Sequence, residues 1–469
     1  MADISRITQR LEELRLEDHP KAKQLLRELT YAQQVGNRAA VQRIKTRLHV
    51  LIQRFQEYPF TEDTPSNSYT DNIITLGETL QQERLYTVQE EELTKHLLSI
   101  GQSGSGKTST IYNILLQLST PFWAFDRKQD YRHLINKRND ILVLPWNRLR
   151  FNPLKPPEGV GPIRWAMVIS EILSHSTDLL SGSRNYVLTH IIELYKQYDL
   201  FTASTEPYPS LTELESLMKG DKINFVRKTS NYRDTVLNRV EPMTEVTGPV
   251  FNCSQGHKIP ELLHRNVVFE FGGLNRDIQN FLQEALFAHV YEYLLANRKR
   301  GTGLELVLVM DEAKKIFSYK KEQSDAAGIP EIDDLFAKAR EFGLGTIVSD
   351  QEATKLTDSV KANTDTKILL PTGDHKQFKS IADSMDLSQL QRQYSHRLGV
   401  GQAIIKHGFN RPVPVNMHYV DLNKNITDAK LKQHQNRKWK ALEYTLNKSD
   451  PLRTGREASK KNRGLNDFL

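Results

Sequence analysis

The stretch GQSGSGKT, residues 101–108, decides the fold of this chain. The apolar run Leu97–Ile100 precedes it, and a helix-like segment, residues 109–116, follows it. A strand must deliver such a loop, and a helix N-terminus must aim its free N–H groups at the phosphates. The residues that we expect to bind a nucleoside triphosphate are Gly101, Gln102, Ser103, Gly104, Ser105, Gly106, Lys107, Thr108 and Ser109.

The loop also predicts cofactors. Lys107 is placed to reach the β- and γ-phosphates of ATP, and the hydroxyl of Thr108 is placed to bind Mg²⁺. The alternative is a turn rich in glycine and serine. Every defining position of the motif carries the required residue, and the loop lies between a strand-like and a helix-like segment. Both features favour the phosphate-binding loop.

The bulk composition indicates a soluble globular protein. The chain has 469 residues, of which 38% are hydrophobic and 26% charged. No apolar run approaches the roughly 20 residues of a membrane helix, and the N-terminus lacks the pattern of a secretory signal. The single cysteine, Cys253, excludes an intramolecular disulfide, so we expect a cytoplasmic protein. The net charge of +7 permits a polyanionic partner.

Composition and periodicity divide the chain into four parts. We expect a helical section over 1–58, a linker over 59–72, an ATPase core over 73–420, and a basic helix and tail over 421–469. A helical insertion is expected within the core, at about 155–262, because strand-like segments resume after it. The N-terminal section carries three apolar stripes at helical spacing. They predict either three helices packed on one another or a hairpin that docks a partner, since so small a bundle buries little core.

Short apolar runs predict a mostly parallel α/β sheet. They lie at 73–76, 85–88, 122–125, 267–271, 306–310 and 345–349. The run at 306–310 ends in Asp311 and Glu312, at the end of a strand where parallel sheets bind ligands. We expect Asp311 to hold the Mg²⁺ shell and Glu312 to polarise the attacking water. The alternative is a solvated acidic strand end.

Three further positions are candidates. Gln351 follows the strand 345–349, where a polar side chain can sense the γ-phosphate or be an ordinary turn residue. Arg340 lies on an amphipathic segment, residues 332–342, and can act as an arginine finger toward a neighbouring subunit or pair with a surface carboxylate. Asp126 follows the strand 122–125, where it can face nucleotide or metal or close a turn.

A lysine cluster follows the acidic pair. It is either a DNA-facing loop or a solvated charge run. The histidines show no metal-binding spacing, so we expect no metal besides Mg²⁺. The members of the cluster are Lys314, Lys315, Lys320 and Lys321.

These pieces, in this order, resemble the HerA/FtsK superfamily of hexameric DNA-pumping ATPases over about residues 73–420. The phosphate loop and the acidic pair are common to many NTPases, and the stretch from Arg340 to Gln351 is what narrows the choice. The segments that carry the resemblance are 96–101, 126–131, 152–154, 183–186, 339–344, 349–351 and 398–403. The N-terminal section departs from the small β-barrel of HerA, and the chain lacks the membrane helices of FtsK.

The resemblance implies a RecA-like core that assembles as a ring, with nucleotide between subunits and Arg340 supplied in trans. It implies an ATP hydrolase that moves along double-stranded DNA, as a homo-oligomer of six subunits. A protein partner such as a nuclease is expected at the N-terminal helices. Two alternatives stay open: a coupling ATPase of conjugation or type IV secretion, and an ATP-gated scaffold for an effector.

Overall fold

A computed structural model describes residues 2–13, 16, 20–62, 72–202, 207–221, 228–298, 300–301, 303–322 and 331–449. One sheet of eleven strands runs through this part of the chain, in the order β2-β1-β11-β10-β9-β3-β8-β7-β4-β6-β5. The strands are β1 Ile73–Thr79, β2 Leu85–Gln89, β3 Leu97–Ile100, β4 Phe122–Asp126, β5 Leu142–Pro145, β6 Val267–Glu270, β7 Leu306–Asp311, β8 Leu344–Asp350, β9 Thr366–Leu369, β10 Gln402–His407 and β11 Val413–Met417.

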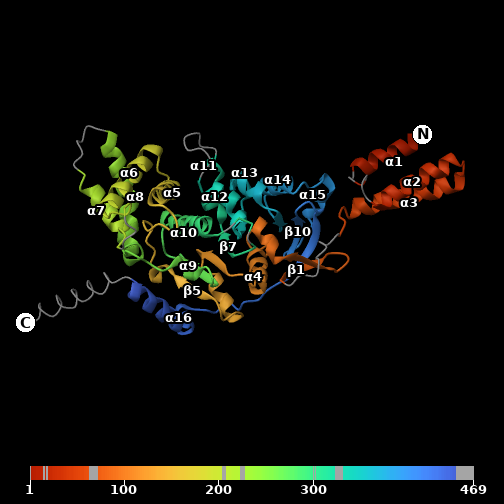
Figure 1. The fold of residues 1–469 in the computed structure, drawn as a ribbon. Coiled ribbons are helices and arrows are strands. Elements are labelled where there is room, and N and C mark those ends of the chain that lie inside the picture. The colour runs from red at the N-terminus through yellow and green to blue at the C-terminus, as the bar shows by residue number, and fades with distance from the viewer. Residues whose placement is uncertain are drawn as a thin grey trace, which may run out of the picture.

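The half of the sheet from β9 to β5 is parallel, and the other half is antiparallel. Strands β3, β4 and β6 are buried along their whole length, as expected where helices cover both faces. Figure 1 shows α12, α13 and α14 on one side of the sheet and α4 on the other. The predicted α/β fold with a mostly parallel sheet is therefore confirmed.

The helices fall into groups along the chain. The first three form the N-terminal section, α5–α9 lie in the predicted insertion, and α16 closes the described chain. Their bounds are α1 Ala2–Glu13, α2 Pro20–Gln34, α3 Arg38–Glu57, α4 Lys107–Gln117, α5 Pro162–Thr177, α6 Ser181–Gln197, α7 Leu211–Lys219, α8 Lys228–Thr247, α9 Ile259–Leu262, α10 Arg276–Asn297, α11 Tyr319–Glu322, α12 Glu331–Ala339, α13 Asp358–Asn363, α14 His375–Ser384, α15 Gln389–Ser395 and α16 Asp428–Ser449.

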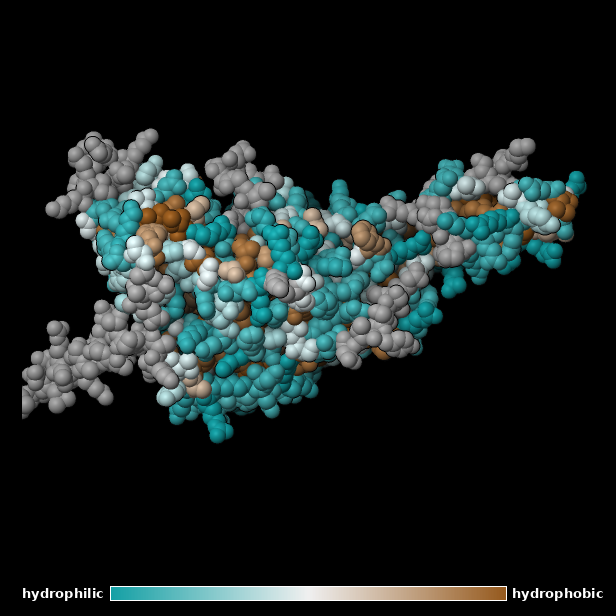
Figure 2. Space-filling model, viewed as in Figure 1, coloured by the Kyte–Doolittle hydropathy of each residue, from teal (hydrophilic) through white to brown (hydrophobic). Residues whose placement is uncertain are grey.

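The three N-terminal helices have a hydrophobic core of their own. Their buried side chains include Leu25, Leu29, Ile44 and Leu48, and they form a cluster separate from that of the sheet. Figure 1 places these helices at one end of the molecule, and Figure 2 shows a hydrophobic stretch along a largely hydrophilic section. Helical spacing places Val35 on one apolar stripe with Leu25 and Leu29, but Val35 is instead 62% exposed.

The segment after α3 does not behave as a free linker. Tyr58 and Phe60 are buried and pack edge-on against Tyr394 of α15. The carboxylate of Glu62 accepts hydrogen bonds from the backbone N–H groups of Gln81 (2.8 Å) and Gln82 (2.7 Å). Tyr58 and residues 59–62 of the predicted linker thus anchor the N-terminal helices to the body, and 63–71 lie outside the described residues.

Helix α16 covers the edge of the sheet. Gln435 accepts a hydrogen bond from the Val143 N–H (3.4 Å) and donates one to the Ile141 carbonyl (3.1 Å). The indole of Trp439 donates to the Val143 carbonyl at 2.8 Å. These side chains satisfy backbone groups that an edge strand leaves open. The predicted C-terminal helix is present, and the tail over 450–469 lies outside the described residues.

Candidate nucleotide site

Two glycines allow the loop between β3 and α4 to curl. Gly106 precedes α4 with a φ of 110°, a conformation that strains any residue with a Cβ atom. A Cβ on Gly101 would lie 2.5 Å from the Ser105 Oγ and 2.7 Å from the Leu370 Cβ, so a larger residue does not fit there. The loop therefore runs from a buried strand directly into a helix N-terminus, which is the arrangement that binds phosphate.

The ammonium of Lys107 lies inside this curl. Its Nζ donates hydrogen bonds to the carbonyls of Gly101 (2.5 Å) and Gln102 (2.7 Å), and the residue is only 8% exposed. Burial lowers the pKa of Lys107, and the carboxylates of Asp311 and Asp350 partly offset this effect. A cation is thus held in the concave side of the loop before any phosphate arrives.

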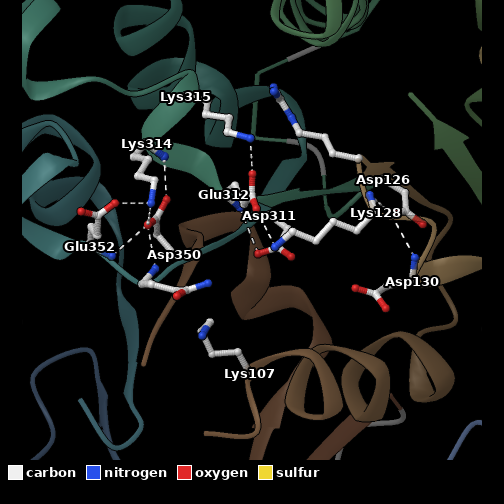
Figure 3. A network of polar contacts seen from close by, with 12 residues as sticks. Lys107, Asp126, Lys128, Asp130, Asp311, Glu312, Lys314, Lys315, Asp350 and Glu352 are labelled. Carbon is white, nitrogen blue, oxygen red and sulfur yellow. Dashed lines mark hydrogen bonds and ion pairs between the residues drawn. The ribbon is translucent and has the colours of Figure 1, made fainter. Parts of the chain in front are cut away.

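Strands β3, β8 and β7 are neighbours, and this brings the acidic residues to the loop. Ile100 is paired with Asp350, and Asp311 with Ser349, so all three strands end at the same level. The Gly101 N–H donates to the Asp350 carbonyl at 3.3 Å. The predicted acidic strand end and the phosphate loop therefore lie at one edge of the sheet (Figure 3).

Glu312 is held by two lysines. It takes a left-handed backbone conformation, with a φ of 52°. Its carboxylate pairs with the Lys128 Nζ at 2.5 Å and with the Nζ of Lys315, as Figure 3 shows. Partial burial raises the pKa of Glu312, but the two lysines outweigh it and lower the pKa to about 2. The carboxylate is therefore ionised, and both of its oxygens have cationic partners.

Asp350 is the centre of a second network, and it was not among the predicted site residues. It is 1% exposed and accepts hydrogen bonds from the N–H groups of Lys314 (2.8 Å), Gln351 (2.6 Å) and Glu352 (2.9 Å). The Lys314 Nζ lies 3.7 Å from Asp350 and donates to Glu352. Burial raises the pKa of Asp350, and these N–H groups and Lys314 oppose the rise. The network fixes the turn that presents Gln351.

Asp126 closes the turn after β4. It is 2% exposed and accepts hydrogen bonds from the N–H groups of Lys128 (3.0 Å), Asp130 (3.2 Å) and Tyr131 (2.8 Å). Burial, together with Glu270, raises the pKa of Asp126 to about 7 against these three donors. Of the two predictions for Asp126, the geometry favours the turn. This turn is what aims Lys128 at Glu312.

The other predicted residues lie as follows. Thr108 and Ser109 lie in the first turn of α4, and the Ser109 hydroxyl accepts a hydrogen bond from the Val420 N–H at 2.9 Å. Gln351 is partly exposed just after β8, beside the phosphate loop. Arg340 is exposed before β8 begins, at the edge of the sheet opposite to the loop. The structure thus gathers all the predicted catalytic and metal-binding residues except Arg340.

The lysine cluster is divided between two surroundings. Lys314 and Lys315 pair with carboxylates inside the nucleotide site, which makes them poor candidates for a DNA-facing loop. Lys321 pairs with Asp178 at 3.0 Å, and Lys320 is exposed on α11. Contact of these lysines with DNA stays a prediction.

Sequence reasoning also missed Lys128 and Glu352 as site residues. Lys128 lies in the post-strand segment 126–131, which the sequence indicated as a whole, with Asp126 as its only named candidate. The position of Lys128 could have indicated this role, because turns at the carboxyl ends of parallel strands face the same ligand region. Only the order of the strands shows which turn meets Glu312.

The donor atoms suit Mg²⁺ bound with a triphosphate. Mg²⁺ takes oxygen ligands and keeps several waters, so one hydroxyl and one carboxylate suffice beside phosphate. One oxygen of Asp311 accepts the Glu312 N–H at 3.0 Å, and within the described chain the other makes no hydrogen bond. Thr108, on the first turn of α4, supplies the hydroxyl. The described part of the chain contains no group of three or more His, Cys, Asp or Glu residues that could hold a metal.

Known proteins resemble this chain in sequence and in fold. No family model matches it. The DNA double-strand break repair helicase HerA of Sulfurisphaera tokodaii is 21% identical over 358 residues, covering 74% of this chain and 69% of the relative. None of the described helices has the length and apolar character needed to cross a membrane.

Two solved structures share the fold. VirB4 of Thermoanaerobacter pseudethanolicus superposes with a TM-score of 0.56 at 16% identity, over 76% of this chain and 99% of that one. The bacterial conjugative coupling protein TrwB gives a TM-score of 0.57 at 13% identity, over 77% of this chain and 91% of that one. The predicted resemblance to the HerA/FtsK superfamily of P-loop ATPases is confirmed, in sequence by the HerA helicase and in fold by VirB4 and TrwB.

Proposed function

We propose that this protein is an ATP-driven motor that forms a ring and moves along double-stranded DNA. The observation that carries the proposal is the meeting of Lys107, Asp311 and Glu312 at one edge of the sheet. The similarity to a HerA repair helicase supports DNA as the polymer. TrwB has been solved with a non-hydrolysable ATP analogue and with ADP and Mg²⁺, which supports the same ligands here.

Each of these residues has its own role toward the phosphates. Lys107 exchanges its two loop carbonyls for oxygens of the β- and γ-phosphates, and the N–H groups of the loop and α4 bind the same oxygens. Thr108 and Asp311 would hold Mg²⁺, whose charge would offset that of the phosphates. Gln351, at the end of β8, contacts the γ-phosphate or the attacking water.

The two lysines restrain Glu312. An ionised carboxylate can orient water for attack, but Lys128 and Lys315 are bonded to its oxygens and lower its basicity. Release from one lysine would make Glu312 a stronger base during turnover. Transition-state charge is stabilised by Lys107 and by Arg340 of a neighbouring subunit in a ring of six, which places the nucleotide between subunits.

The protein acts in the cytoplasm, with a nuclease or another effector as its partner. Tyr31 of α2 and Val35, the residue after it ends, are 69% and 62% exposed, and they offer an apolar contact for that partner on the N-terminal section. The fold shared with VirB4 and TrwB favours one alternative, a coupling ATPase that serves a conjugation or secretion channel.

The decisive experiment measures steady-state ATP turnover with and without duplex DNA, together with displacement of a triplex-forming strand from that duplex. A DNA translocase hydrolyses ATP faster with DNA and displaces the third strand, and Lys107→Ala does neither. An ATP turnover rate that is the same with and without duplex DNA would overturn the motor proposal. Solution mass with an ATP analogue tests the ring of six.

A further inference from the structure

The net positive charge of this chain lies outside its ATPase body. Residues 58–427 carry a net charge of −3, although the whole chain carries +7. Residues 20–57, which form α2 and α3, contain eight lysines and arginines against two glutamates. A motor that grips a polyanion needs positive charge, and the body as a whole does not supply it.

Three arginines share one face of α3. Arg43, Arg47 and Arg54 are exposed, and their spacing of four and seven residues keeps them on one side of the helix. At 1.5 Å per residue they span about 16 Å along the axis. The buried stripe of Ile44 and Leu48 lies on another side.

These arginines take little part in ion pairs within the protein. Arg47 lies 3.6 Å from Glu28, and both side chains are well exposed, so this pair is weak. Arg43 and Arg54 make no ion pair within the described part of the chain. Residues 44–53 of α3 include no acid, and Glu57 lies one turn beyond Arg54. The three arginines are therefore not interleaved with acids along α3, and the acids that adjoin the face are Glu28 of α2 and Glu57.

The face is also fixed to the motor. The end of α3 is anchored by the packing of Tyr58 on Tyr394 of α15. A few residues after α15, the Gly401 N–H donates to the Ser105 carbonyl of the phosphate loop at 3.2 Å. A force applied to α3 is therefore transmitted to α15, which is followed closely in sequence by a contact with the phosphate loop.

We infer that the Arg43–Arg47–Arg54 face of α3 binds the phosphate backbone of double-stranded DNA, as a second grip outside the motor core. Guanidinium groups suit phosphate because their forked donors match its oxygens. Phosphate contacts carry no sequence information, so this grip is independent of sequence. The choice of DNA as the polymer rests on the proposed function.

The test compares three variants of the full chain. The first is Arg43→Gln/Arg47→Gln/Arg54→Gln, since glutamine keeps helix propensity. The second replaces the same arginines with lysine and keeps the charge. The matched control, Lys432→Gln/Arg437→Gln/Lys440→Gln, removes three exposed charges from α16, the other basic helix. Circular dichroism and the melting temperature check that each variant folds.

Binding to a fluorescent 30-base-pair duplex is measured by anisotropy over about 50–200 mM KCl. Each lost phosphate contact lowers the slope of log affinity against log salt by about 0.9. The glutamine variant of α3 is expected to lose about 2–3 from this slope and at least about tenfold in affinity at 100 mM. The lysine variant and the α16 control should stay within about twofold of wild type, and basal ATP turnover should not change.

Equal losses in the α3 and α16 variants would mean that net charge alone matters, and would overturn the inference. Wild-type affinity in the α3 variant would overturn it as well, while the motor proposal stands. Absence of DNA binding by the wild-type protein would overturn both.

Discussion

Glu312→Gln separates the chemical role of this carboxylate from its structural one. The amide keeps the shape of the side chain but cannot polarise water, so ATP should bind and hydrolysis should fall. General-base catalysis contributes about 10²–10⁴ in rate, and we expect kcat to fall by that factor. The variant should accumulate in the ATP-bound state, because binding depends on Lys107 and the loop.

The same change has a cost in stability that follows from the ion pairs. The pKa of Glu312 is about 2 against an ordinary 4.5, and such a difference corresponds to about 3 kcal/mol. Lys128 is 48% exposed and Lys315 32%, so solvent screening reduces this to about 1–2 kcal/mol. The stabilisation is present above pH 4.5 and disappears as the pH falls toward 2. At pH 7 the glutamine variant therefore loses all of it.

Two assays test both parts. Single-turnover hydrolysis with excess enzyme gives the chemical rate, and urea unfolding at pH 7 gives the change in free energy. Glu312→Asp serves as the control, since it keeps the charge and shortens the reach. Normal hydrolysis by Glu312→Gln would refute the catalytic assignment, and unchanged stability would refute the reasoning from the two lysines.

Three further predictions address the same site. Lys107→Ala should nearly abolish ATP turnover, because it removes the main charge that counters the phosphates, and turnover close to wild type in a steady-state assay would exclude the nucleotide site. Lys128→Ala should raise turnover without DNA by about fivefold, if about 1 kcal/mol of restraint on Glu312 is lost; a fall in kcat would show instead that Lys128 assists catalysis. Arg340→Ala should leave ATP binding intact and cost about 10³–10⁵ in rate, and mixing it with Lys107→Ala should restore part of the activity, whereas mixed rings that stay inactive would exclude a role in trans.

The fold could be predicted where its signals are local. The loop at 101–108 and the strands β3, β4, β6, β7 and β8 follow from apolar runs and glycines. Strands β9 and β11 were not predicted, for physical reasons. β9 carries Lys367, which is 8% exposed and donates to the Thr364 carbonyl, so its sequence does not look buried. β11 contains Pro414, and proline is expected in the edge strands of a sheet, so the sequence does not look like an interior strand.

The site could be predicted as a list of acids and bases, but not as a set of pairs. Lys314, Lys315, Lys320 and Lys321 look alike in sequence, yet two of them bond to carboxylates of the nucleotide site. Lys315 lies three residues after Glu312, so this pair is local in sequence. The Lys314–Glu352 pair depends instead on β8 lying beside β7, and this order is a property of long-range pairing that charge spacing along the chain does not reveal.

Arg340 shows what the strand order adds to the argument. It precedes β8, and the phosphate loop follows β3, which is parallel to β8. Seven residues of β8 separate Arg340 from the level of Asp350, and at about 3.3 Å per residue this is about 23 Å. An arginine side chain does not cover that distance, so Arg340 cannot act on the nucleotide of its own subunit. If Arg340 contributes to hydrolysis, the phosphate that it contacts belongs to another copy of the chain, and a single subunit has an incomplete active site.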